Sequence, residues 1–153
     1  MQPQNHEKII STKKQKNITM NADFGKFLLR LGVGGLMIFH GIHKLIHGHD
    51  FIINQLKAHN LPELLWIGVP IGEIIAPIFL IVGFATRISA SIVAFTMFMS
   101  LFLVKGMGSF GLDPNTGGVL AELNLLYLLS ALAIAFIGPG TIRFYKGKKG
   151  IWV

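Results

Sequence analysis

Four of the six histidines in this chain fall within ten consecutive positions, in the stretch FHGIHKLIHGHDF at residues 39–51. If this stretch is helical, His40, His43, Lys44 and His47 fall within an arc of about 100° and share one face. Imidazole rings gain and lose protons near neutral pH and coordinate transition metals, while a lysine ammonium donates hydrogen bonds. The spacing therefore predicts a polar helix face that can transfer protons, hold a polar ligand or bind a metal ion.

Two carboxylates in later apolar segments are the expected partners of this face. Glu73 lies in the stretch IGEIIAPIFL, and Glu122 lies near the start of the last apolar segment. Ionisable groups inside a membrane span are costly, so they usually face the interior of a bundle and mark a functional site. At a rise of about 1.5 Å per helical residue, both carboxylates and His40 are expected in the outer half of the membrane. Asn124 and Tyr127 follow Glu122 closely and can join the same cluster.

The residue types alone leave four interpretations of the cluster open. It can be a buried polar network that only holds the helices together, a site for a quinone or another small redox ligand, a metal site, or part of a proton-coupled transport path. For a redox ligand, the predicted catalytic residues are His40, Glu73 and Glu122, and the predicted ligand-binding residues are His40, His43, Lys44, Asn124 and Tyr127. For a transition metal such as zinc, copper or iron, the predicted ligands are His40, His43, His47 and Glu73.

The composition points to a membrane as the setting of these residues. Apolar residues make up 52% of the 153-residue chain and charged residues only 14%, against a usual charged share of about 25%. The chain contains no cysteine, which excludes disulfide and thiolate chemistry by its own residues. Four apolar windows meet or approach the length of about 20 residues that a spanning helix needs, and none alternates like a barrel strand. These windows are Phe24–Ile46, Leu64–Phe84, Ile88–Val104 and Gly118–Gly138.

The predicted fold is therefore an all-α membrane protein with four transmembrane helices in a bundle. Eleven Lys and Arg residues flank the spans on one side and three on the other, so the positive-inside rule predicts that both termini lie in the cytoplasm. The expected organisation is a polar, basic and mobile tail at residues 1–22, a transmembrane domain at residues 23–141 and a basic tail at residues 142–153. The net charge of +7 does not indicate nucleic-acid binding, because the basic residues are divided among separate segments.

Two further features concern how closely the elements approach the polar face. Gly34, Gly41 and Gly48 recur every seven residues along the first predicted helix. This stripe predicts either close helix packing or free space for a ligand beside the histidines. The outer loop at residues 47–63 carries several apolar side chains, and we expect it to form a short amphipathic helix along the membrane surface.

The same residues resemble the DoxX family. RLGVGGLMIFHGIHKL at residues 30–45 is similar to the first-helix signature of that family, in which an Arg-Leu pair, a glycine run and a His-Gly pair precede Lys-Leu. IGEIIAPIFLIVGFATRISA at residues 71–90 resembles its second motif, a Gly-Glu pair followed by a glycine and a Thr-Arg turn. The resemblance covers residues 24–141, and the positions that match the family pattern are His40, Lys44, Glu73, Arg87 and Glu122.

The resemblance implies a small four-helix protein of the bacterial cytoplasmic membrane. It also implies a link to the settings in which members of the family occur, which are quinone-linked oxidation, membrane complexes of oxidative-stress defence and copper-related operons. The leading hypothesis is a membrane subunit whose His/Glu cluster serves redox chemistry at a quinone, together with a redox partner protein or a second copy of the chain. The alternatives are a structural or assembly protein with a purely packing role for the cluster, and a metal-binding or transport protein.

Overall fold

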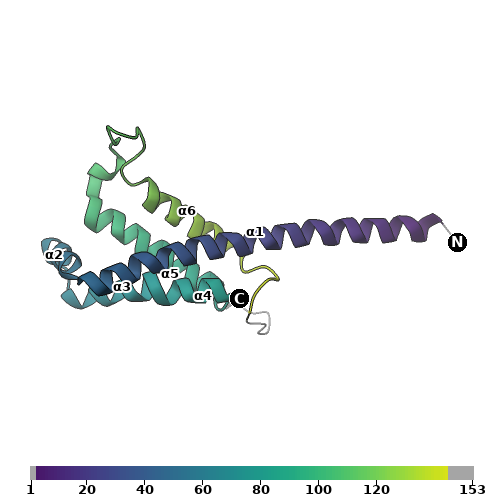
Figure 1. Cartoon of the computed structure of the whole chain (residues 1–153), viewed down its shortest axis with the longest axis horizontal. Coiled ribbons are helices and arrows are strands. Elements are labelled where there is room, and N and C mark those ends of the chain that lie inside the picture. Colours follow the sequence, from purple (N-terminus) through teal and green to yellow (C-terminus); the bar gives the residue numbers. More distant parts are fainter. Residues whose placement is uncertain (1–2, 145–153) are drawn as a thin grey trace.

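The computed structural model describes residues 3–144, which form helices joined by short loops (Figure 1). The only extended pairing within these residues is an isolated antiparallel bridge between Leu112 and Val119, so the all-helical prediction is confirmed. In chain order the elements are α1 (Pro3–His47), α2 (Asp50–Ala58), the 3-10 helix η1 (Glu63–Ile67), α3 (Gly68–Pro70), the π-helix η2 (Ile71–Ile75), α4 (Ala76–Val82), α5 (Thr86–Ser100), the π-helix η3 (Leu101–Lys105), the 3-10 helix η4 (Gly106–Phe110) and α6 (Glu122–Ile137).

Helix α1 is much longer than its apolar window. The sequence predicts a mobile tail over residues 1–22, and in the structure residues 3–22 continue the helix beyond the other elements (Figure 1). The segment after Pro3 contains no glycine or further proline before residue 25, and its lysines and glutamine are good helix formers. A proline at the first helical position is tolerated because its missing N–H has no partner there in any case. Polarity was therefore a poor guide to helix length.

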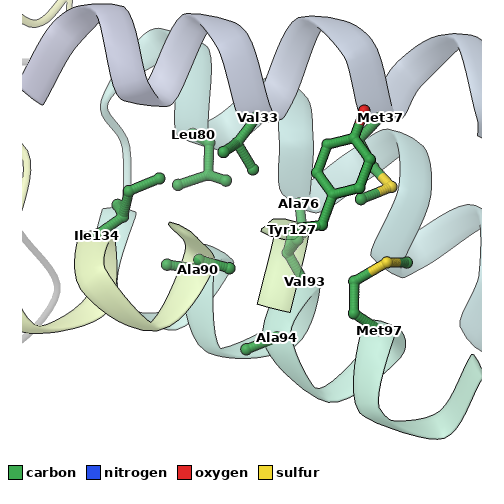
Figure 2. Packing of buried hydrophobic residues seen from close by; sticks show 11 residues of the cluster. Val33, Met37, Ala76, Leu80, Ala90, Val93, Ala94, Met97, Tyr127 and Ile134 are labelled. Atoms are coloured by element: carbon green, nitrogen blue, oxygen red, sulfur yellow. The ribbon is translucent and has the colours of Figure 1, made fainter. Parts of the chain in front are cut away.

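Helices α1, α4, α5 and α6 meet in an apolar core that contains both small and large side chains (Figure 2). Ala90 of α5 and Ala131 of α6 are completely buried and allow these two helices to pack closely. Met37 of α1, Leu80 of α4 and Ile134 of α6 fill the remaining space and are also almost fully buried. This core fixes the relative rotation of the helices, and hence which of their polar side chains face one another.

Two glycines let α1 lie directly on the second apolar stretch. A Cβ atom at Gly34 would be 2.8 Å from the carbonyl oxygen of Pro77, and one at Gly41 would be 2.9 Å from the carbonyl oxygen of Glu73. The close-packing interpretation of the glycine stripe is therefore confirmed at these two positions. A Cβ atom at Gly48 would meet nothing within 4 Å, and Gly48 has a φ of +87°, a conformation that favours glycine after a helix end. The stripe thus ends in a turn that leads into α2.

The α4–α5 turn and the last described residues lie together at one end of the bundle. Arg30 is fully buried and donates hydrogen bonds to the carbonyl oxygens of Leu80, at 3.3 Å, and of Ile142. The amide of Phe144 donates to the carbonyl oxygen of Val82 at 3.0 Å. The guanidinium group therefore sits at the carboxyl end of α4, where the helix dipole favours a cation.

At the same end of the bundle, Asp23 links α1 to the segment that follows α6. Thr141 Oγ1 donates a 2.6 Å hydrogen bond to Asp23 Oδ2, and Lys26 Nζ donates to Oδ1 at 3.2 Å. The hydrogen bond from Thr141 is the largest reason why the pKa of Asp23 lies below its ordinary value. Helix α1 enters the bundle at this end, beside Thr141, and residues 145–153 of the predicted C-terminal tail lie outside the described residues.

Two continuous helical stretches in the described part of the chain are long and apolar enough to cross a membrane, judged by length and composition. They are Glu63–Val82 and Thr86–Val104, and each begins and ends within two residues of a predicted window. Helix α6 is apolar but shorter, and it begins at Glu122 rather than at the predicted Gly118. The reason is local, because residues 112–119 form a turn closed by backbone hydrogen bonds before the helix starts.

Candidate functional site

A cavity of about 240 Å³ lies between α1, η2, α5 and α6, toward the end of the bundle away from Arg30. Helix α2 covers part of it with Phe51 and Ile52, so the predicted helix in the outer loop exists and borders the site. The other walls are partly apolar, and their polar side chains are His40, Lys44, Glu73, Ser100, Asn124 and Tyr127. The structure therefore brings five of the predicted site residues to a single cavity.

The central group is the carboxylate of Glu73. Its residue is only 1% exposed, and Lys44 Nζ donates a hydrogen bond to Oε1 at 2.5 Å, which makes a salt bridge between α1 and η2. The other oxygen, Oε2, is buried and has no hydrogen-bond partner among the described residues. A buried carboxylate oxygen without a donor is costly, so Glu73 is the cavity residue at which an additional hydrogen-bond donor would contribute most.

His40 of α1 and Tyr127 of α6 contribute aromatic rings that contact each other at the cavity wall. Their ring centroids are 6.1 Å apart and the rings meet edge to face. Tyr127 itself is nearly buried, at 7% exposure, and packs in the core beside Met37 (Figure 2). One helical turn earlier, Asn124 Nδ2 donates a 3.0 Å hydrogen bond to Ser100 Oγ. Polar groups thus line the cavity on both the α1–η2 side and the α5–α6 side.

The sequence around Glu73 explains why this carboxylate points inward. Pro77 has no N–H to donate to the carbonyl oxygen of Glu73 four residues earlier, and its ring would crowd that carbonyl in a regular helix. The chain responds with the π-helical turn η2, and such turns commonly occur at functional sites. Gly41 then lets α1 approach the Glu73 carbonyl closely, which brings Lys44, one turn further along α1, within reach of the carboxylate.

Three predicted site residues do not reach this cavity. Glu122 is exposed, and its carboxylate turns back toward Gly118. His43 and His47 are also exposed, and they stack on each other with ring centroids 4.0 Å apart. The buried stripe of α1 runs through Gly41, and both rings lie at least about 120° around the helix from it, whereas Lys44 lies only about 60° away.

The predicted metal site does not fit the geometry. The described side chains of residues 3–144 include no group of three His, Asp or Glu residues that lie close enough together to hold a metal ion. The four predicted ligands are divided, because Glu73 pairs with Lys44 inside the bundle while His43 and His47 stack on its outside. On the predicted polar face of α1, the residue that pairs with Glu73 is Lys44.

Sequence reasoning missed several residues of the cavity wall. Met97, Ser100 and Val104 all line it, and their spacing of three and four residues places them on one face of the α5–η3 helix. That spacing is visible in the sequence, but a serine within an apolar run gave no signal for a polar site. Phe51 and Ile52 were expected to lie along the membrane surface rather than over the cavity.

The fold and the cavity define a small all-helical protein whose apolar helices surround a cavity bordered by the Lys44–Glu73 ion pair. A family model described as DoxX matches residues 25–106. That match covers just over half of the chain, so the chain belongs to the DoxX family, which is membrane-associated. His40, Lys44 and Glu73 all lie within the matched segment.

Two curated proteins illustrate the similarity. The chain is 29% identical over 136 residues to "Putative oxidoreductase CatD" of Bacillus subtilis (strain 168), an alignment that covers 85% of this chain and 96% of that protein. It is 35% identical over 124 residues to an uncharacterized protein of Haemophilus influenzae, covering 77% of this chain and 89% of the relative. No solved structure matches the chain significantly.

Proposed function

We propose that the chain is a membrane subunit of a redox system and that its cavity binds the ring of a quinone. The observation that carries this proposal is the Glu73 carboxylate, which is buried, paired through one oxygen with Lys44, and left with a second oxygen that no donor satisfies. A relative over most of the chain bears an oxidoreductase name, which supports a redox role. The predicted catalytic role of Glu122 is not part of the proposal, because that residue is not on the cavity wall.

The size of the cavity suits a single substituted ring. A cavity of about 150 Å³ in another protein is sufficient for benzene, and the cavity here is larger, at about 240 Å³. Its apolar surfaces, including Met37 and Met97, can contact the faces of a ring. A quinone has two ring oxygens, and the polar groups of the cavity come from two pairs of elements, α1 with η2 and α5 with α6.

The chain's own residues can bind these oxygens and move protons. Lys44 and His40 are donors beside one ring oxygen, while the Tyr127 hydroxyl and the Asn124 amide are donors beside the other. Conversion of a quinone to its quinol consumes two electrons and two protons. We assign the electrons to a redox partner protein and the protons to relay through the Lys44–Glu73 pair and His40, which lie at the wall of the cavity.

The proposed setting is a bacterial cytoplasmic membrane crossed four times, by α1, by the two candidate spans and by α6. The hydrogen bonds at Arg30 and Asp23 bring α1, where it enters the bundle, and the last described residues to the same end of the bundle as the α4–α5 turn. An even number of crossings is consistent with that arrangement. The excess of lysine and arginine near this end supports a cytoplasmic location for it.

A second candidate function follows from the ion pair itself. Lys44 and Glu73 join α1 to η2, so the polar cluster can serve only to hold the bundle in register. Buried polar groups that fix the register of packed helices are known in other systems. In that case the protein is a structural or assembly factor, and the unsatisfied carboxylate oxygen has no ligand to accept from.

Replacement of Glu73 with glutamine distinguishes these two functions. The protein would be purified in mild detergent from quinone-containing membranes, and the bound quinone would be extracted and measured. Loss of a charge-assisted hydrogen bond worth about 1.5–3 kcal/mol should lower quinone retention about tenfold or more, while the helical content stays the same. Glu63→Gln is the matched control, because Glu63 is exposed and pairs only with exposed Lys57. No retained quinone in the unmodified protein, or equal retention in both variants, would contradict quinone binding.

A further inference from the structure

The Lys44–Glu73 pair leaves the cavity wall with a hydrogen-bond acceptor that no described side chain satisfies. A lysine ammonium only donates hydrogen bonds, so Glu73 accepts from Lys44 through Oε1, as a carboxylate does. The second oxygen, Oε2, is buried and has no donor among the described residues. Glu73 lines the cavity, and the torsion that sets the plane of a carboxylate is soft. A small rotation therefore lets Lys44 Nζ and a donor in the cavity each bond one oxygen.

The other polar groups of the wall do not distinguish the oxidised from the reduced form of a quinone. Lys44 Nζ carries three N–H groups, of which one is used by Glu73. The hydroxyl of Tyr127 and the amide of Asn124 can each donate as well as accept. The carbonyl oxygens of a quinone and the hydroxyl oxygens of a quinol both accept hydrogen bonds, so these groups serve either form. Among the described residues of the wall, Glu73 is the carboxylate, which only accepts.

The burial of Glu73 makes this difference count. The residue is 1% exposed, so solvent contributes little to its unsatisfied oxygen. A bound quinone has no O–H group, and its carbonyl oxygen would place a second partial negative charge beside the carboxylate. A bound quinol can donate a hydroxyl proton to the carboxylate, and hydrogen bonds to an ionised acceptor are stronger than those between neutral groups. The two forms have nearly the same size and shape, so the contact at Glu73 is where their binding differs.

We propose that the cavity binds the quinol form of its ligand in preference to the quinone form. This inference rests on the proposed function and specifies the ligand as an aromatic diol that donates a hydrogen bond to Glu73. The oxygen of the same hydroxyl group accepts from the free N–H groups of Lys44. One hydroxyl thus matches the acceptor and the donor that the ion pair presents at the cavity wall.

The preference has a consequence for electron transfer. A site that holds the reduced form more tightly raises the midpoint potential of the bound couple, because it stabilises the product of reduction. Each tenfold difference in affinity corresponds to about 30 mV for a two-electron couple. A quinone bound beside Glu73 is then a stronger electron acceptor than the same quinone in the membrane, which favours electron transfer to it from a redox partner.

The test compares the two forms of one ring on the full chain in nanodiscs under anaerobic conditions. The probes are a dimethoxy-methyl-benzoquinone and its quinol, and their dissociation constants are measured by calorimetry. We expect the quinol to bind about tenfold more tightly or better. Glu73→Gln should weaken both probes, because Lys44 loses the partner that holds it at the wall, and should weaken the quinol about tenfold more, so that the preference disappears. Glu63→Gln is the matched control and should keep the preference, because Glu63 is exposed, pairs with Lys57 and does not line this cavity.

The remaining results overturn the inference and separate it from the proposed function. If neither form binds the unmodified protein, the proposed function fails and the preference fails with it. If both forms bind but the quinone binds as tightly as the quinol or more tightly, only the preference fails. A preference for the quinol that persists in Glu73→Gln overturns its assignment to this carboxylate. The comparison on the unmodified protein needs no variant, so it decides the preference even if Glu73→Gln does not fold, as judged by its helical content.

Discussion

Replacement of Lys44 with methionine should destabilise the protein more than replacement of Glu73 with glutamine, although both changes break the same ion pair. The difference arises from burial, since Glu73 is 1% exposed while the Lys44 side chain is 37% exposed. Without Lys44, a carboxylate is left inside the bundle with no cation beside it. Without the Glu73 charge, the lysine ammonium can turn toward the open side of the cavity and recover solvent or headgroup contacts.

The magnitudes follow from the same geometry. Removal of one partner of a buried pair costs about 3–5 kcal/mol when the remaining charge stays buried, which applies to Lys44→Met. Glu73→Gln loses a charge-assisted hydrogen bond and keeps a polar amide in place, for a cost of about 1.5–3 kcal/mol. The double variant removes both charges, so it should be less destabilised than the sum of the two single variants, with a coupling energy of about 1–3 kcal/mol.

The assay is reversible unfolding of the purified protein in detergent, followed by circular dichroism and analysed as a double-mutant cycle. All four proteins are measured at one pH and one detergent concentration, so that only the pair changes. Two results would refute the reasoning. One is a larger loss of stability for Glu73→Gln than for Lys44→Met, and the other is strict additivity in the double variant.

Two further predictions concern the packing of α1. Gly41→Ala should lower the free energy of unfolding by about 1–3 kcal/mol, because its Cβ would press on the Glu73 backbone. Gly35→Ala is the control and should be neutral or slightly stabilising, because a Cβ at Gly35 would meet no atom within 4 Å. Equal losses of stability for the two variants in thermal unfolding would contradict this prediction. Asp23→Asn should destabilise the protein at neutral pH and lose this effect in acid. The pKa of Asp23 is lowered by the hydrogen bond from Thr141, so the stabilisation is complete above the unfolded pKa of about 3.9 and disappears as the pH falls through the lower folded value. Melting temperatures of the two proteins that stay equally far apart from pH 7 down to strong acid would be inconsistent with that pairing.

The sequence predicted the helices well and their ends less well. Apolar runs of about 20 residues locate the stretches Glu63–Val82 and Thr86–Val104 closely. The reason is that an apolar segment in a membrane has to pair its own backbone N–H and C=O groups, and a helix does so. The start of α6 depends on the backbone hydrogen bonds of the preceding turn, which composition does not encode. The outward extension of α1 was missed because polarity was taken as a sign of a tail, whereas helix propensity decides the matter once a long helix has been nucleated.

The sequence predicted which polar residues share one side of α1, but it did not predict how α1 is rotated about its axis relative to the neighbouring helices. A helical wheel places His40, His43, Lys44 and His47 together, yet only His40 and Lys44 line the cavity. The rotation is fixed by Gly41, which has to face η2 because no side chain fits there. Periodicity alone cannot supply this choice, since it depends on the neighbouring helix and on the π-helical turn that Pro77 imposes.

The most direct test of the central claim is photoaffinity labelling with an azido-quinone, followed by mass spectrometry of the labelled peptides. We expect the label on the cavity wall, in the segments that contain Phe51, Met97 and Tyr127, and a strong reduction of that label in Glu73→Gln. Label confined to outward-facing positions such as Leu126 and Phe136, or labelling of the cavity segments that is unchanged in Glu73→Gln, would contradict a quinone site at this carboxylate.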